Sequence, residues 1–166
     1  ASPLTVRGGT LRGSGSLADV TVKSTGALAP GDATTIGTMT VSSNLTLQGT
    51  TTMRVSASGG VVSGNDQVNV TETLKQGGTL DVTLAGAVTG GEVFTLFTAR
   101  TFSGGFGTIN VPNLPSGLTW VTSKLAVDGT LSVLPVLNFS QAGNVLSFSW
   151  AAGFKLQSQT NAITVG

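Results

Sequence analysis

The chain has 166 residues, of which 39% are apolar and only 9% are charged, and its formal net charge is +1. This length is sufficient for one domain with a substantial core, and the apolar content excludes a disordered chain. The near-neutral charge excludes the cationic surface that nucleic-acid binding requires, and no apolar run approaches the roughly 18 residues that insert into a membrane.

The composition favours an exported protein. Cysteine is absent, so disulfides cannot stabilise the chain, and few charges are available for its surface. Its polar faces must therefore consist mainly of Thr, Ser, Asn and Gln. We expect an extracellular or bacterial cell-surface location, and we interpret the opening "ASPLTV", which contains no signal peptide, as a mature or trimmed N-terminus.

The N-terminal half consists of short alternating apolar and polar runs bounded by Gly, Asn, Asp or Pro, which is the pattern of β-strands. No window has the spacing of apolar residues that an amphipathic helix needs. Strands are expected at residues 4–6, 19–22, 38–41, 44–47, 52–55, 67–70 and 79–84.

Similar phrases recur at intervals along this half. Val20 and Met39 are 19 residues apart, and Met39 and Val68 are 29 residues apart. Coils of about 20–30 residues with variable loops are typical of a β-solenoid, in which stacked layers share one aliphatic core. We therefore predict an all-β fold, a parallel β-helix (β-solenoid) that spans residues 1–134 and carries a C-terminal β-hairpin or cap.

From about residue 92 the composition becomes richer in aromatic residues and in proline. Larger side chains suit the terminal layers of a solenoid, where the end of the core must be covered. Trp120 has two interpretations: a core or cap residue, or an exposed platform on which a sugar stacks.

Residues 135–166 are predicted to form a separate extension. The phrase "LNFSQAGNVLSFSW" reads as a β-hairpin with its turn at Gly143–Asn144, and residues 154–165 could add one or two strands. A unit of about 30 residues is too small to bury its own apolar face. The extension must therefore pack on the solenoid, on other residues or on another chain.

The sequence offers little for catalysis or cofactor binding. Histidine, cysteine and tyrosine are all absent, and no motif supports Asp66 and Glu72 as a catalytic pair. We expect Asp32 and Asp66 to shape turns instead. No metal or cofactor is expected, although calcium is the metal that the available oxygen ligands would suit best.

The phrases "GALAPGDATTIGTMTVSSNLTLQGTTTMRV" and "NDQVNVTETLKQGGTLDVTL" resemble the autotransporter-associated β-strand repeats of large exported bacterial proteins. The segment from "GEVFTLF" to "LSVLP" is similar to the one that closes such repeats in Verrucomicrobia-like and Planctomycetes-like bacteria. The final "LSFSWAAGFKLQSQTNAITVG" looks like the start of a C-terminal module found there. The resemblance implies a right-handed parallel β-helix that serves as a stalk, adhesin or fibre and has no catalytic residues.

Three functions remain open from the sequence. The first is a non-enzymatic exported subunit that self-assembles with identical copies into a filament, sheath or surface layer. The second is a carbohydrate-adhering stalk or accessory domain that binds polysaccharide, and the third is an enzyme built on a β-helix. Self-assembly would use the edge strand around residues 4–6 or the extension. The predicted contact residues are Leu4, Val6, Leu137, Phe139, Leu146, Phe148 and Trp150, with Trp120 as the candidate glycan-stacking residue.

Overall fold

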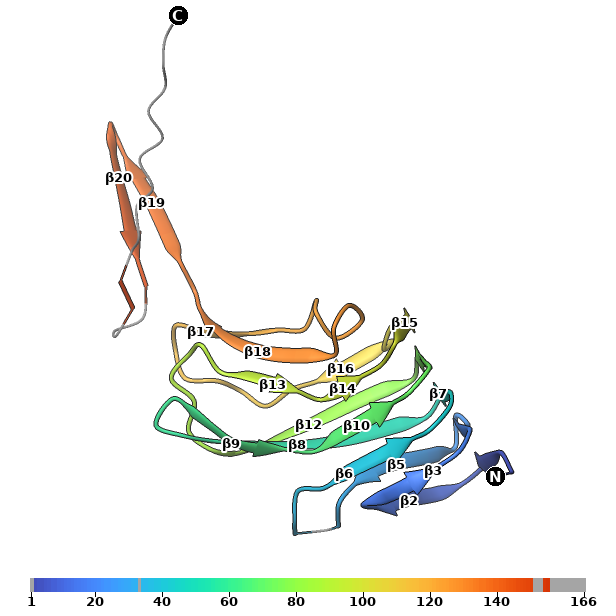
Figure 1. Ribbon diagram of the computed structural model, residues 1–166. Coiled ribbons are helices and arrows are strands. Elements are labelled where there is room, and N and C mark those ends of the chain that lie inside the picture. The colour runs from blue at the N-terminus through green and yellow to red at the C-terminus, as the bar shows by residue number, and fades with distance from the viewer. Residues whose placement is uncertain (1, 33, 151–153, 156–166) are drawn as a thin grey trace, which may run out of the picture.

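The computed structural model describes residues 2–32, 34–150 and 154–155 (Figure 1). This part of the chain is all-β and contains no helix. The chain passes repeatedly through three parallel sheets, so strands far apart in sequence stack in layers. The predicted parallel β-solenoid is confirmed.

Each layer of the solenoid contributes to three parallel sheets, A, B and C. Sheet A has the order β1 (Leu4–Val6), β4 (Val20–Val22), β7 (Leu45–Leu47), β11 (Thr73–Gln76) and β15 (Thr101–Gly104). Sheet B has the order β2 (Gly9–Gly13), β5 (Gly26–Pro30), β8 (Thr50–Ser58), β12 (Thr79–Gly86) and β16 (Thr108–Asn110), and β9 (Val61–Asn65) folds back antiparallel onto β8. Sheet C has the order β3 (Gly15–Leu17), β6 (Thr38–Val41), β10 (Gln67–Val70) and β14 (Phe97–Thr98).

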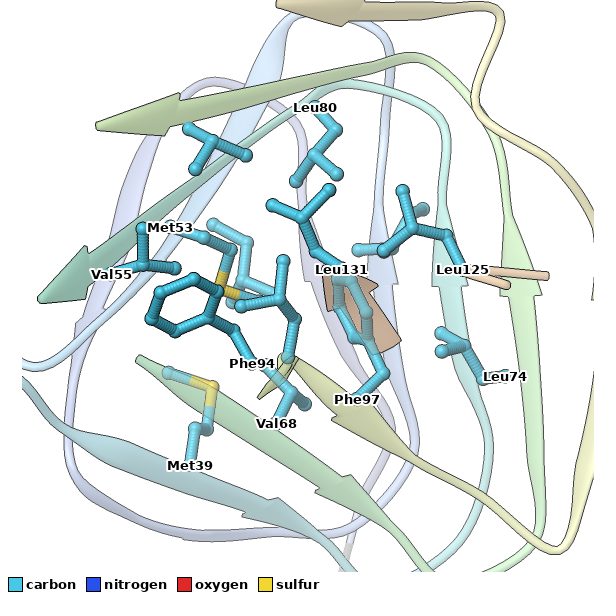
Figure 2. Packing of buried hydrophobic residues seen from close by; sticks show 14 of the residues in the cluster. Met39, Met53, Val55, Val68, Leu74, Leu80, Phe94, Phe97, Leu125 and Leu131 are labelled. Carbon is cyan, nitrogen blue, oxygen red and sulfur yellow. The ribbon is translucent and has the colours of Figure 1, made fainter. Parts of the chain in front are cut away.

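The alternation within each strand decides which side chains enter the core. In β6 and β10 every second residue is buried, and Met39 lies in register with Val68, which lies in register with Phe97. Successive layers therefore place apolar side chains directly above one another. Figure 2 shows the result, a single interior on which Met39, Met53, Leu80, Phe94 and Leu131 converge from the surrounding strands.

The predicted interval between layers is right in one case and wrong in another. Met39 and Val68 are register partners, as the 29-residue spacing implied. Val20 and Met39 belong to different sheets, and the partner of Val20 in the next layer is Leu45. The sequence pattern did not reveal that each layer makes three strands, because several of them are short and rich in Gly, Ala or Ser.

Polar side chains on the outer faces also pair between layers. The Asn110 amide donates to the Asp81 carboxylate at 2.6 Å, and the Thr98 hydroxyl donates to the Asn69 side-chain oxygen at 2.8 Å. Both pairs join register partners that are 29 residues apart. Side-chain hydrogen bonds between neutral or singly charged groups thus connect the outer faces of successive layers.

Glycines line the turn from sheet A to sheet B because this turn brings successive layers into backbone contact. A Cβ added at Gly26, Gly49 or Gly78 would overlap a carbonyl oxygen of the layer before it. Gly49 has no unusual φ, so its requirement is purely one of space. A side chain at this position would force two layers apart.

A short antiparallel sheet closes the C-terminal end of the core. It has the order β13 (Val93–Thr95), β18 (Thr130–Pro135) and β17 (Leu118–Val121). Phe94 is opposite Leu131 and Trp120 is opposite Val133, and these side chains pack against the core cluster. The buried Gln76 amide donates to the Leu125 carbonyl at 2.7 Å, which fixes the loop between β17 and β18. We call this sheet and loop the cap.

The C-terminal extension begins as a hairpin of β19 (Asn138–Ala142) and β20 (Val145–Ser149), which projects from the cap in Figure 1. Its turn contains Gly143 with a φ of 59°, as the sequence predicted. Strand β18 continues to Pro135, so the predicted boundary at 134–135 falls at its end. The strands predicted beyond residue 155 lie outside the described residues.

The turn glycines provide a direct test of the stacking constraint. We expect Gly49→Ala to lower the free energy of unfolding by about 3 kcal/mol, because its Cβ meets only backbone atoms that cannot move aside. Gly8→Ala is the control, since a Cβ there has no neighbour within 4 Å and the expected change is below about 0.5 kcal/mol. Urea unfolding measures both, and equal values for the two variants would contradict the interpretation.

Candidate interaction surfaces

The seven carboxylates of the chain all take part in local hydrogen bonds or ion pairs. Asp32 accepts from the backbone N–H groups of Thr34 and Thr35, each at 2.7 Å. Hydrogen bonds from Thr35 and Thr34 hold the pKa of Asp32 well below its ordinary value. Asp32 therefore shapes a turn, as predicted. The other partners are Asn44 for Asp19, Arg54 for Asp66, Arg100 for Glu72, Asn110 for Asp81, Thr89 for Glu92 and Thr130 for Asp128.

Glu92 is a buried carboxylate that also shapes the local backbone through hydrogen bonds. Burial raises its pKa, but hydrogen bonds from the Thr89 and Gly90 backbone N–H groups, at 2.7 and 2.9 Å, outweigh burial and lower it overall. The charged carboxylate thus shapes the loop that leads into β13.

Asp66 and Arg54 form a buried corner between sheets B and C. Only 2% of the Asp66 side chain is exposed, and its carboxylate lies 3.2 Å from the Arg54 Nε. It also accepts from the Gly37 and Arg54 backbone N–H groups, each at 2.9 Å. Arg54 in turn donates to the Thr35 carbonyl. Asp66 does not pair with Glu72, whose partner is the exposed Arg100. Asp66 therefore fixes the loop at residues 34–37.

Two adjoining hollows of about 390 and 260 Å³ form a trough on the outer face of sheet B, and Arg54 and Thr83 line both. Thr52 and Arg12 contribute polar groups to the smaller one. Ile36 adds an exposed apolar side chain to the larger one. The trough is therefore lined by hydroxyl, guanidinium and carboxylate groups beside a small apolar wall, with Asp32 and Asp66 supplying the carboxylates.

The N-terminal end of the solenoid has no counterpart of the cap within the described residues. Strands β1, β2 and β3 each pair on one side only, with β4, β5 and β6. Their inward side chains are half-buried, whereas the register partners one layer up are at most 2% exposed. The half-buried side chains are Leu4, Val6, Leu11 and Leu17. We call these three strands and four side chains the open end.

A hollow of about 150 Å³ extends into the open end between β2 and β3, and Met39 of the next layer lines it. Gly15 occupies the inward position below Met39, so no side chain fills this place. The only charges among residues 2–18 are those of the exposed Arg7 and Arg12. The open end is thus apolar at its centre and weakly cationic at its rim.

The hairpin presents a second apolar surface, formed by the five extension residues that the sequence analysis named. Phe139 lies directly opposite Phe148. Because successive residues of a strand point to opposite sides, Leu137, Leu146 and Trp150 lie on the same side as these two rings. Ser140 and Ser147 lie on the opposite side. Every residue of β19 and β20 is exposed. We call this side the hairpin face; its residues are Leu137, Phe139, Leu146, Phe148 and Trp150.

The base of the hairpin contacts the loop that leads into β13 through Phe154. Leu137, Trp150 and Phe154 line a shallow apolar pocket there, and the Phe154 ring lies against Gly90. The Trp150 indole N–H donates to the Phe154 carbonyl at 2.8 Å. This contact joins the base of the hairpin to the loop that leads into β13.

Trp120 lies within the cap. Its ring centroid is 6.2 Å from that of Phe94, and its indole N–H donates to the Pro112 carbonyl at 2.8 Å. The residue is half-buried, which fits the packing interpretation, and glycan stacking on it stays a prediction. The structure therefore places Trp120 apart from both the open end and the hairpin face.

Comparison with protein-family models, with curated proteins and with solved structures finds no match to this chain. The resemblance to autotransporter-associated repeats therefore stays a prediction from sequence phrases. Within the described ranges, the acidic residues form no cluster of three that could hold a metal ion. The same ranges contain no helix long and apolar enough to cross a membrane.

The Asp66 corner can be tested by removing its charge. Asp66→Asn leaves the Arg54 guanidinium without its partner, so we expect a loss of about 3 kcal/mol in the free energy of unfolding. Glu72→Gln breaks the exposed pair with Arg100 and should cost less than about 1 kcal/mol. Denaturant unfolding compares the two, and a larger effect at Glu72 would refute the assignment of Asp66.

Proposed function

We propose that this protein is a non-enzymatic structural protein, a β-solenoid subunit that self-assembles into an extracellular filament, sheath or surface layer. The observation that carries the proposal is the hairpin face, whose five apolar side chains are 36–75% exposed in the part of the chain that the structure describes. Apolar surface of this kind marks an interaction site.

The chemistry of the flanks supports the same proposal. With 9% charged residues, neighbouring subunits repel one another weakly. The carboxylates act within turns and between layers, where they support the fold rather than a reaction. The extracellular location rests on the composition and on the resemblance of the repeated phrases.

The proposal predicts concentration-dependent assembly of the full chain. Sedimentation velocity should show large species, and electron micrographs should show fibres or layers. Removal of residues 137–166 deletes the hairpin face and should leave monomers, because the exposed apolar contact surface is then lost. A full chain that stays monomeric at all concentrations, or a truncated chain that forms the same fibres, would overturn the proposal.

A second candidate function is adhesion to polysaccharide, which the trough on sheet B favours. Hydroxyl and guanidinium groups beside an apolar wall suit a sugar chain, whose ring faces are apolar and whose edges are polar. The trough residues Arg12, Thr52 and Thr83 were not singled out from the sequence, because they are distant in the chain and belong to no motif.

A glycan array distinguishes the trough from aromatic stacking. If a sugar occupies the trough, Thr83→Val should weaken binding at least tenfold, because Thr83 lines both hollows, while Trp120→Ala should not. The reverse pattern would assign binding to Trp120. Thr119→Val, at an exposed position of the cap, is the matched control for the threonine substitution. No binding to any glycan would refute this second function.

A further inference from the structure

We infer that the trough on sheet B takes a neutral polysaccharide, a chain of uncharged sugars that lies across the strands, rather than an acidic polysaccharide. This inference rests on the second candidate function, adhesion to polysaccharide, and names the chemical class of its ligand. The residues that line the two hollows of the trough all belong to the described part of the chain.

The trough runs across the strands of sheet B. The residues of its smaller hollow come from four successive strands of that sheet, and they include Arg12 of β2, Ala29 of β5, Thr52 of β8 and Thr83 of β12. Three spacings between neighbouring strands amount to about 14 Å. One sugar ring is much shorter than this distance, so the trough offers contacts to several consecutive rings of a chain.

The loop that ends at Gly37 contributes the other side of the trough and is held in place. The Gly37 N–H donates to the buried Asp66 carboxylate at 2.9 Å, and the Arg54 guanidinium donates to the Thr35 carbonyl. Thr35 and Ile36 of this loop line the larger hollow. Because the loop and the sheet are joined before a ligand arrives, binding requires little ordering of the protein.

The charged groups that line the trough balance one another. The Arg54 guanidinium lies 3.2 Å from the Asp66 carboxylate, so these two charges are paired within the protein. The other two charged residues of the lining, Arg12 and Asp32, are exposed and opposite in sign. An acidic chain would bring repeated negative charges towards Asp32 and Asp66, whereas a neutral chain meets no like charge.

The uncharged polar groups of the lining are hydroxyl groups, which match those of a neutral sugar. Thr52 and Thr83 line the smaller hollow, and Ser56 lines the larger one. Each hydroxyl group donates and accepts hydrogen bonds, as does every hydroxyl group of an uncharged sugar. The exposed side chains of Ile36 and Ala85 lie beside them and suit the apolar faces of sugar rings.

Two variants remove hydrogen-bonding groups from the smaller hollow without disturbing the core. Thr52→Val keeps the branched shape at a half-buried outward position of β8, and Arg12→Gln changes an exposed side chain of β2. Each should weaken binding of a neutral chain by about three- to tenfold, the effect of one or two lost hydrogen bonds.

Each variant has a matched control outside the trough. Thr46→Val alters a half-buried outward threonine of β7 in sheet A, and Arg7→Gln alters an exposed arginine of the first layer. Neither residue lines a hollow of the trough. Both controls should bind like the unaltered chain, and the unfolding midpoint of every variant reports whether its solenoid is intact.

The experiment compares neutral and acidic sugar chains of equal length on one glycan array, at low and at high salt. Neutral chains should bind more tightly than acidic ones, and their affinity should change less than about twofold with salt, because no net charge is neutralised. Affinity should also rise with chain length until the trough is filled.

The outcomes separate the inference from the function on which it rests. Equal or tighter binding of acidic chains would overturn the inference while adhesion to polysaccharide still stands. Binding of neutral chains that Thr52→Val and Arg12→Gln leave unchanged would overturn it as well, because the ligand would then lie outside the smaller hollow. No binding to any glycan would refute the second candidate function itself.

Discussion

The structure depends on the in-register stacking of successive layers. Parallel pairing joins each strand to the strand one layer before it, and the same register places Val68 over Met39 and Phe97 over Val68. Backbone hydrogen bonding and core packing are therefore satisfied by a single alignment. At the turn into sheet B this alignment brings Gly49 against the backbone of the previous layer, so the closest contact of the stack is made where a side chain is absent.

Within the described residues, stacking pairs every layer on both sides except the first and the last. The last layer is closed by the cap, whose apolar side includes Leu131. The first layer keeps its free strand edges and half-buried leucines. The hairpin face adds a second uncovered surface beyond the cap. The flanks between these ends are tied by pairs such as Asp81 with Asn110, and Ile36 and Val61 are exposed apolar side chains on them.

Alternating aliphatic strands were predictable from sequence, whereas the number of strands in each layer was not. Residues 38–41 and 67–70 alternate clearly, and their predicted bounds agree with β6 and β10. Strands β3 and β5 contain too few large apolar residues to show a period, since their sequences are GSL and GALAP. They are recognised as strands only by their pairing with neighbouring strands. The pairing of Asp66 with Arg54 joins residues in separate strands and has no local pattern.

The hairpin was predictable together with its turn, because Gly143 separates two alternating runs. The open end was foreseen only as an edge strand at residues 4–6. Its other two strands and the hollow below Met39 appear only when the layer is assembled in space. The trough on sheet B was equally hidden, since the loop at residues 34–37 reaches it through the Arg54 contact.

The nearly constant interval of 28 or 29 residues between the later register partners has a consequence for how such a protein changes over evolutionary time. Duplication or loss of one whole interval would add or remove one rung, altering the height of the body by a single strand spacing of about 4.8 Å. Neither terminus would have to be redesigned. The number of layers can therefore change in uniform steps while the cap and the hairpin stay the same.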